Sequence, residues 1–260
     1  MLITISPAKS LDFDSPNRTT THTIPDFLKD SRELIKSLRK FSAGKLSKLM
    51  SISEKLGELN HTRNQQWKTP FTLDNAKQAI LAFQGDVYVG LEAETFKAAD
   101  FRFAQKHLRI LSGLYGVLRP LDLIQAYRLE MSTKLKTNKG KDLYEFWGDT
   151  ITDAVNRAIA QQGDGVLINL ASNEYFRSVV KEKLEARIIT PEFKDAKGGK
   201  YKMISFFAKK ARGLMSAFII KNRLKDPGDI KGFDVAGYTF NEGMSSQDKW
   251  TFTREEDGAR

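Results

Sequence analysis

Basic residues are concentrated in one segment of the chain, and phosphate binding is the chemistry that such a concentration supports. Between Lys194 and Lys225, ten basic residues stand against one acidic residue, Asp195, so this segment carries +9 of the chain's net charge of +10. Cations that displace counterions from phosphates supply the sequence-independent affinity of a protein for nucleic acid, so the segment predicts a nucleic-acid interface. The residues that we expect to contact phosphates here are Lys194, Lys197, Lys200, Lys202, Lys209, Lys210 and Arg212.

Three aromatic residues, Tyr201, Phe206 and Phe207, alternate with these cations. An exposed ring in such a place can stack on an unpaired base, whereas the alternative is that the rings pack into the core. The lysines also have a simpler interpretation, which is that they solvate the outer faces of a hairpin and a helix. Smaller basic excesses occur within Lys29–Lys48 and Lys134–Lys141. The charge therefore predicts an anionic partner without identifying it.

A glycine-bearing turn is a second candidate for phosphate contact. Gly113, Gly116 and Arg119 follow an apolar stretch that begins at Leu108. Glycines let a backbone approach a phosphate closely, and a following helix would offer unpaired N–H groups, as in a helix-hairpin-helix clamp. Such clamps usually separate their glycines by one residue, whereas two residues separate Gly113 and Gly116. The alternative is a helix that ends at a glycine cap before a tight turn.

Polar residues at predicted strand ends suggest a competing function. Lys9 follows an apolar first strand, where the alternative is a surface lysine, and Ser172 and Asn173 follow a later one, where they could instead cap a helix. Arg128 and Glu130 share one face of their segment and are expected to pair or to line a groove. If folding gathers Lys9, Arg128, Ser172 and Asn173 with Lys209 and Arg212, these residues would clamp a phosphorylated group, with Glu130 as base.

Several common kinds of chemistry are excluded by the residues that the chain lacks. It has no cysteine, which removes disulfides, thiolate metal sites and thiol nucleophiles. Its three histidines, His22, His61 and His107, are far apart, and no nucleophile elbow, Walker loop or dinucleotide fingerprint is present. A metal site made only of carboxylates stays open. We therefore predict no cofactor and no metal, and we favour a binding protein over an enzyme.

Hydrophobic periodicity predicts the elements that must position these residues. The expected helices are Pro25–Phe41, Ser53–Trp67, Thr72–Phe83, Ala98–Leu111, Leu143–Ala160 and Phe207–Ile220. The expected strands are Leu2–Ser6, Asp86–Gly90, Gln125–Met131, Gly165–Leu170, Arg187–Lys194, Lys200–Phe206, Tyr238–Asn241 and Lys249–Thr253. Gly198-Gly199 is expected to be a two-residue hairpin turn, and Glu255–Arg260 a frayed tail.

The composition is that of a soluble globular protein. The chain has 260 residues, of which 40% are hydrophobic and 28% charged, enough for a sizeable core. We predict a mixed α/β (α+β) fold in which helices surround a mixed β-sheet, as one domain over residues 1–260 or as two intimately packed lobes. The N-terminus lacks the features of a signal peptide and no apolar run is long enough to span a membrane, so a cytoplasmic protein without a membrane partner is expected.

Longer blocks of sequence resemble the bacterial YaaA peroxide-stress protein family. The blocks are Ile5-Ser-Pro-Ala-Lys9, Gln78-Ala-Ile-Leu-Ala-Phe83 with Gly85-Asp-Val-Tyr88, Leu111-Ser-Gly-Leu-Tyr-Gly-Val-Leu-Arg-Pro-Leu-Asp122, Tyr127-Arg-Leu-Glu-Met131, Asn169-Leu-Ala-Ser172 and Ile204-Ser-Phe-Phe-Ala-Lys-Lys-Ala-Arg-Gly-Leu-Met215. They extend from the first predicted strand into the last third of the chain.

The resemblance implies a cytoplasmic bacterial protein that supports survival of hydrogen peroxide by limiting unincorporated iron and the DNA damage that iron causes. It also implies an unusual mixed fold with a positively charged cleft, lined by Lys194 through Arg212, and a helix-hairpin-helix element over Leu108 to about Glu130. Gly113, Gly116 and Arg119 would then lie at the hairpin. Because the chain shows no iron ligands, iron control is expected to be indirect.

Two functions remain in competition at this point. The first is a DNA-binding protein that protects or helps to repair DNA, contacting double-stranded, single-stranded or branched DNA mainly through phosphates. Lys9 and Arg128 are then expected to contact DNA together with the glycine turn and the basic segment. RNA is a further candidate partner because no reader of the 2′-hydroxyl is identifiable. The second is an enzyme that acts on a nucleotide, nucleic acid or other phosphorylated small molecule. We expect a monomer, although no residue fixes the oligomeric state.

Overall fold

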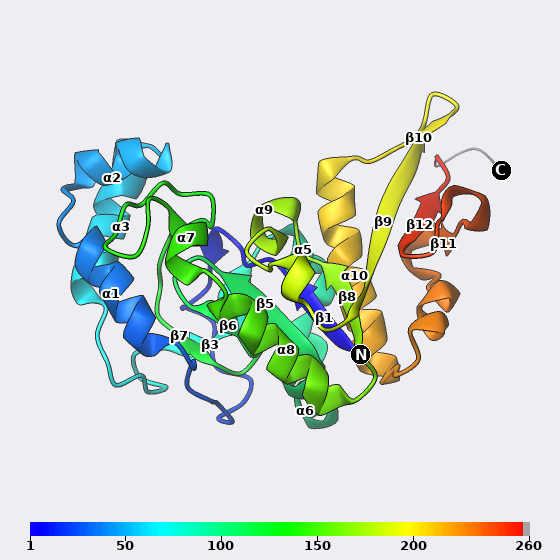
Figure 1. Cartoon of the computed structure of the whole chain (residues 1–260), viewed down its shortest axis with the longest axis horizontal. Helices are drawn as coiled ribbons and strands as arrows, with labels where there is room; N and C mark the ends of the chain where they lie inside the picture. Colours follow the sequence, from blue (N-terminus) through cyan, green and yellow to red (C-terminus); the bar gives the residue numbers. More distant parts are fainter. Residues whose placement is uncertain (257–260) are drawn as a thin grey trace.

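A mixed β-sheet forms the centre of the protein, and the computed structural model describes it within residues 1–256 (Figure 1). Eight strands of this described part form the sheet, in the order β11-β12-β9-β8-β1-β5-β6, with β10 paired to β9. Their bounds are β1 (Leu2–Ile5), β5 (Leu108–Ser112), β6 (Gly116–Leu118), β8 (Val166–Leu170), β9 (Arg187–Lys197), β10 (Lys200–Lys202), β11 (Tyr238–Phe240) and β12 (Lys249–Arg254). Two small sheets pair β2 (Ser10–Leu11) with β4 (Phe83–Gln84) and β3 (Lys77–Gln78) with β7 (Leu123–Ile124). The mixed α/β architecture predicted from the sequence is confirmed.

The middle of the sheet is parallel and buried. Strands β12, β9, β8, β1 and β5 run parallel, and β11, β10 and β6 are the antiparallel additions. Every residue of β1 is buried, as expected for a central parallel strand covered on both faces. Its apolar run is why the sequence predicts this strand correctly.

Helices pack on this sheet: α10 lies beside β9, whereas α1, α2 and α3 build the side of the molecule remote from β9 and β12 (Figure 1). The α-helices are α1 (Leu28–Leu38), α2 (Ala43–Met50), α3 (Glu54–Gln66), α4 (Ala79–Ala82), α5 (Asp86–Leu91), α6 (Ala98–His107), α7 (Leu143–Trp147), α8 (Thr150–Gln162), α9 (Asn173–Phe176) and α10 (Ser205–Asn222). Short 3₁₀ turns occupy Ala93–Thr95, Lys181–Lys183, Pro227–Gly232, Val235–Gly237 and Glu242–Met244. None of the helices in the described part has the length and apolarity that crossing a membrane requires.

Several expected elements differ from the structure. Asp86–Gly90 belongs to helix α5 rather than to a strand, and Thr72–Phe83 forms a turn, strand β3, the short helix α4 and the start of β4 in place of one helix. The helix expected over Ala98–Leu111 ends at His107 and continues as β5, while Gln125–Glu130 has no regular structure. These segments are short and buried against neighbours, so tertiary packing overrides their local pattern. The last four residues of the expected tail, 257–260, lie outside the described residues.

Helices α5 and α10 touch through their backbones. A Cβ placed on Gly213 would lie 1.8 Å from the carbonyl oxygen of Val87, and one placed on Gly90 would lie 2.1 Å from the carbonyl oxygen of Lys210. Only glycine at both positions allows this approach. The two glycines therefore fix α10, which carries several of the predicted site residues, against α5.

We expect Gly213→Ala to lower the free energy of unfolding by about 2 kcal/mol, because the added methyl group forces α5 and α10 apart. Urea unfolding followed by tryptophan fluorescence measures this change. Gly44→Ala is the matched control, since Gly44 lies in α2 with nothing within 4 Å of its Cβ position. The control is expected to be stabilised slightly, by roughly 0.5 kcal/mol, through helix propensity. Equal stability of the two variants would mean that the helix contact tolerates a side chain.

The order of the strands creates a natural ligand-binding position. The chain leaves β1 and returns as β5 on one side of it, whereas it leaves β8 and returns as β9 on the other side. The carboxyl ends of β1 and β8 therefore lie where the connections diverge. In open α/β sheets, this switch point is where ligands bind.

Candidate nucleic-acid interface

The basic segment forms a projecting hairpin followed by a helix. Strands β9 and β10 pair antiparallel around Gly198 and Gly199, whose φ angles of 59° and 73° are those that a type I′ turn requires. The predicted Gly-Gly hairpin is thereby confirmed. Helix α10 then starts at Ser205 and carries Lys209, Lys210 and Arg212. The hairpin stands above the rest of the molecule in Figure 1.

Three lysines share one face of this hairpin. Lys200 lies directly opposite Lys197, and Lys202 lies opposite Asp195, so alternation along the strands places all three lysines on the same side. All three are exposed, and none forms an ion pair with the residues of 1–256. Like charges directly across a strand pair are destabilising. This face is therefore electrostatically uncompensated.

The one acidic residue of the segment does not offset these charges. Asp195 is 5% exposed and accepts hydrogen bonds from the Tyr238 hydroxyl, at 2.9 and 3.0 Å, and from Arg254 Nε at 2.7 Å. The negative charge of Asp195 is paired with the positive charge of Arg254 within the sheet. Lys194 of β9 differs from the three hairpin lysines because it has a carboxylate partner: its Nζ lies 3.8 Å from Oε2 of Glu192.

Two aromatic side chains are exposed beside the lysines. Phe206 and Phe207 lie in the first turn of α10, are 57% and 38% exposed, and contact each other edge to face. Tyr201 is half-buried, on the opposite face of β10 from Lys200 and Lys202. Of the two interpretations of the sequence, exposure therefore holds for the phenylalanines. The Arg254 guanidinium lies over the Phe207 ring, 4.5 Å from its centroid, so Phe206 is the ring with both faces clear of this contact and the better candidate to stack on a base.

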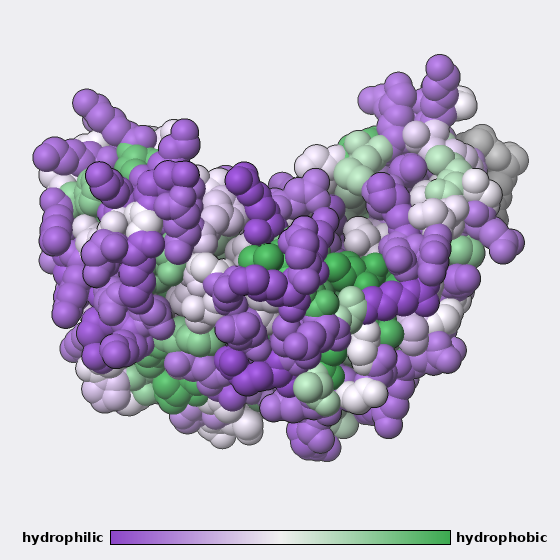
Figure 2. Space-filling view, in the orientation of Figure 1, coloured by the Kyte–Doolittle hydropathy of each residue, from purple (hydrophilic) through white to green (hydrophobic). Residues whose placement is uncertain are grey.

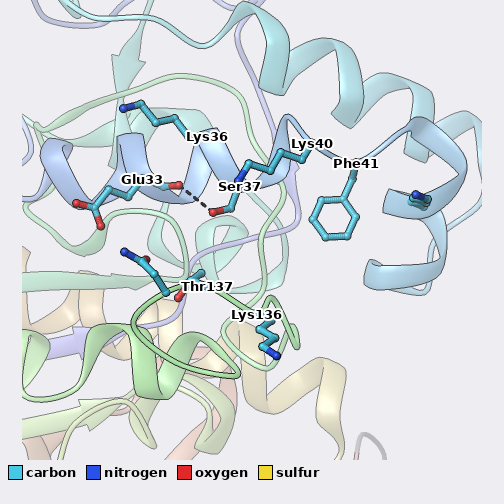
Figure 3. A pocket seen from close by; sticks show the side chains of 9 residues that line it. Glu33, Lys36, Ser37, Lys40, Phe41, Lys136 and Thr137 are labelled. Carbon is cyan, nitrogen blue, oxygen red and sulfur yellow. Dashed lines mark hydrogen bonds between the residues drawn. The ribbon is translucent and has the colours of Figure 1, made fainter.

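A second group of lysines lies in the helical part of the protein. These lysines line an open pocket of about 680 Å³ between α1, α2 and a later loop (Figure 3). The lining includes Glu33, Lys36 and Ser37 of α1, Lys40, Lys45 of α2 and Lys136 of the loop. Lys139 neutralises Glu33 at 3.0 Å and Asp30 at 2.8 Å, which ties the loop to α1. Lys36, Lys40, Lys45 and Lys136 form no ion pair within the described residues. The two smaller basic excesses of the sequence thus meet at one place.

The molecular surface is hollow between these two basic regions. Figure 2 shows the outline dipping between a rim on the α2 side and a rim formed by the β9–β10 hairpin. Helices α5 and α9 lie between the rims in Figure 1. The elements that carry the two lysine groups, α1 and α2 on one side and the β9–β10 hairpin on the other, therefore flank this concavity.

A pocket of about 390 Å³ opens at the carboxyl ends of β1 and β8, at the switch point of the sheet. Lys9, Ser172, Lys209, Arg212 and Glu130 line it, so most of the residues proposed for a phosphate-clamping site do come together. Arg128 reaches this site only through Glu130, to which its Nη2 donates at 3.1 Å, and Asn173 does not line the pocket. We name this cavity the β1/β8 pocket.

Arg212 has an unusual environment in the β1/β8 pocket. It is half-buried, and it forms no ion pair with the described residues. Burial lowers the pKa of its guanidinium, while the charge of Glu192 acts in the opposite direction. The guanidinium is thus a partly desolvated charge with no carboxylate within 4 Å among the described residues, since Glu192, which acts on it from farther away, pairs with Lys249 at 3.0 Å.

The glycine turn has a structural role instead of the predicted one. Residues 108–130, all of them described, form the β5–β6 hairpin and irregular chain where a helix-hairpin-helix element was expected. Gly113 and Gly116 are buried: a Cβ on Gly113 would lie 2.3 Å from Leu129 O, and one on Gly116 would lie 2.9 Å from the Trp147 ring. They cannot reach a phosphate in this arrangement.

Arg119 is engaged by contacts within the protein, although 30% of its side chain is exposed. Its Nη2 lies 3.0 Å from Asp122 and 3.2 Å from Asp26, and it donates to the carbonyl of Ile24 at 2.7 Å. These contacts tie the turn after β6 to the segment before α1. We therefore do not include Arg119 in the interface.

The lysine group at α1 and α2 was not predicted as part of an interface. Lys36, Lys40, Lys45 and Lys136 were visible only as weak charge excesses, because no local pattern joins α1 to a loop about a hundred residues later.

No group of three or more aspartate, glutamate or histidine side chains within residues 1–256 is arranged to hold a metal ion.

A comparison with known protein families gives a match that spans most of the chain. Residues 1–244 match the sequence model of a family described as peroxide stress protein YaaA. The match includes all the residues of the two basic rims and of the β1/β8 pocket.

Proposed function

The chain belongs to the peroxide stress protein YaaA family, and from this premise we propose that it binds DNA during the response to hydrogen peroxide. Binding would protect DNA from iron-driven damage or assist its repair. The contacts would be to phosphates, without marked sequence preference, and the interface would be the concave surface between the two basic rims.

The uncompensated face of the β9–β10 hairpin is the observation that carries this proposal. Lys197 and Lys200 oppose each other across the strands, and neither forms an ion pair with the described part of the chain; Asp195, the carboxylate on the same face, is buried and paired with Arg254. A fold gains nothing from placing two like charges there, whereas a phosphate between them would remove the repulsion. Lys202 on the hairpin and Lys209 and Lys210 in the first half of α10 are exposed as well and follow these lysines along the chain.

The exposed rings of Phe206 and Phe207 support a preference among DNA structures. Base–aromatic stacking requires a base that is not already paired and stacked, and it is worth about 1–3 kcal/mol per base. Duplexes with unpaired nucleotides, junctions and single strands offer such bases, whereas an intact duplex does not. Opened or branched DNA should therefore bind more tightly than an intact duplex of the same length.

The test is a titration of fluorescent DNA with the purified protein, followed by anisotropy at several salt concentrations. Intact duplex, bubble duplex, four-way junction and single-stranded DNA are compared, with duplex RNA as a further arm. With five exposed cations on the hairpin and α10, we expect the logarithm of the duplex association constant to fall with log salt at a slope of about −4 to −5.

Two results would contradict the proposal. One is the absence of saturable DNA binding near physiological salt. The other is binding with a slope near zero, because phosphate contacts by cations must release counterions. Tighter binding of duplex RNA than of any DNA would transfer the proposal to RNA.

A further inference from the structure

The β1/β8 pocket has the size, position and charge of a small-molecule site. We propose that it binds a small phosphate ester of the size of a nucleoside monophosphate, with Arg212 as the principal ligand of the phosphate. This inference does not depend on the hairpin or on DNA binding. Four features of the pocket support it.

The first feature is the position of the pocket. Ser6 to Ser10, which follow β1, line the cavity, and so do Ser172, Glu174 and Tyr175, which follow β8. They are joined by hydrogen bonds, since Ser172 N donates to Ser6 Oγ at 2.9 Å and Ser6 Oγ lies 3.2 Å from Ser172 Oγ. The walls at the switch point are thus preformed, and a volume of about 390 Å³ falls in the range of ligand sites.

The second feature is the unpaired cation. Arg212 is half-buried among the lining residues, and its guanidinium has a lowered pKa because burial disfavours its charge. An anion bound there would supply the missing partner and form charge-assisted hydrogen bonds in a partly dry site. Lys209, three residues earlier on α10, also lines the pocket and adds a second cation for the same anionic group.

The third feature is that two carboxylates of the pocket already have partners. Glu130 accepts from Arg128 at 3.1 Å and pairs with Lys9 at 2.8 Å. Glu174 accepts from the backbone nitrogen and the hydroxyl of Ser132, at 3.1 and 2.8 Å. These carboxylates therefore do not compete for Arg212. Asp86 is the remaining lining carboxylate, at the start of α5, and is available to accept hydrogen bonds from ligand hydroxyl or amino groups.

The fourth feature is the aromatic part of the lining. Tyr88 and Tyr175 are 6% and 8% exposed. The Tyr88 hydroxyl donates to Ser6 O at 3.0 Å, and burial raises the pKa values of both tyrosines well above their usual value. They are neutral rings that can contact a sugar or base. Cations for a phosphate, neutral rings and hydrogen-bonding side chains together match a nucleotide unit better than an inorganic anion.

The experiment measures binding of defined probes by isothermal titration calorimetry. The probes are AMP, dAMP, ribose 5-phosphate, inorganic phosphate and adenosine, with short 5′-phosphorylated and unphosphorylated oligonucleotides to distinguish a free nucleotide from a nucleotide unit of DNA. The proteins are wild type, Arg212→Gln, Arg212→Lys, and the hairpin variant Lys197→Gln/Lys200→Gln/Lys202→Gln. Thermal unfolding of each variant confirms that it is folded.

We expect saturable binding of AMP or dAMP, weaker binding of inorganic phosphate, and little binding of adenosine. Arg212→Gln should weaken nucleotide binding about tenfold or more, since a charge-assisted hydrogen bond is lost. Arg212→Lys should restore part of it, and the hairpin variant should bind nucleotides as wild type does. Binding of phosphorylated oligonucleotides alone would identify a strand terminus as the source of the same chemical group.

The proposal is overturned if none of the phosphate esters binds at millimolar concentration, or if adenosine binds as tightly as AMP. It is also overturned if folded Arg212→Gln protein binds nucleotides as wild type does. The hairpin variant separates this test from the proposed function, because loss of DNA binding with retained nucleotide binding concerns the hairpin alone.

Discussion

Replacement of Asp195 with alanine is expected to lower the free energy of unfolding by about 3 kcal/mol. Asp195 is the buried acceptor for Tyr238 and for Arg254, whose Nη2 lies 2.6 Å from Oδ1. Removing the carboxylate leaves a guanidinium and a hydroxyl without their partner, and breaking a buried ion pair in this way costs about 3–5 kcal/mol. The lower end applies because the side chain of Arg254 keeps 26% of its surface exposed.

Asp195 also occupies the centre of the C-terminal strands. In register it faces Lys202 of β10 on one side and Arg254 of β12 on the other. Burial, together with the hydrogen bond to Asp195, raises the pKa of the Tyr238 hydroxyl, so Tyr238 stays a neutral donor. The loss is therefore expected to loosen the base of the β9–β10 hairpin as well as to reduce global stability.

The measurement is urea unfolding monitored by tryptophan fluorescence, for which Trp250 of β12 is a nearby reporter. The matched control is Asp248→Ala, which removes an exposed ion pair to Arg187 at the other end of β9. An exposed pair of this kind contributes less than about 1 kcal/mol. Equal destabilisation by the two substitutions would contradict the structural role assigned to Asp195.

Local sequence patterns are sufficient to predict the elements that carry the interface. The apolar run of β1, the Gly198-Gly199 turn and the apolar stripe of α10 are all local signals, and each element forms where expected. The exposed cations of the hairpin and α10 were recognisable because they follow one another along the chain. No long-range contact is needed to predict their shared surface.

Elements decided by tertiary packing could not be predicted in this way. The alternating valines of Asp86–Gly90 favour a strand, yet the segment forms α5 because Gly90 lets it lie against the backbone of α10. Gly113 and Gly116 have the composition of a phosphate-binding turn, but the Leu129 carbonyl and the Trp147 ring occupy the space beside them. No local pattern around these glycines predicts that Leu129 and Trp147 pack against them.

The role of Asp195 was hidden for the same reason. In sequence it is an isolated acid in a basic segment and would be read as partial compensation of the charge. In the fold it is paired with Arg254, which lies 59 residues later. The β1/β8 pocket shows the opposite case, because the chemistry of Lys9, Glu130 and Arg212 suggested a shared site and the strand order brings them together.

The variant Lys197→Gln/Lys200→Gln/Lys202→Gln is expected to bind duplex DNA roughly a hundredfold more weakly than wild type at about 0.15 M salt. The estimate assumes one phosphate contact per lysine, each of which adds about 0.9 to the dependence of log K on log salt. Because the three side chains are exposed and unpaired within the described residues, their neutralisation should leave folding stability unchanged or slightly improved.

The matched control is Arg102→Gln/Lys106→Gln/Lys225→Gln, which removes the same charge from three exposed side chains, two in α6 and one after the C-terminal end of α10. These residues line a separate pocket next to α6, away from the hairpin in Figure 1. Any effect of net charge alone should appear equally in both variants. A difference between them therefore reports the location of the interface.

The most direct test of the account is the slope of log K against log salt for duplex DNA, measured side by side for wild type, the hairpin variant and this control. We predict a slope shallower by about 2 to 3 for the hairpin variant and a slope close to wild type for the control. Equal slopes for the two variants would show that the hairpin does not contact phosphates and would contradict the proposed interface.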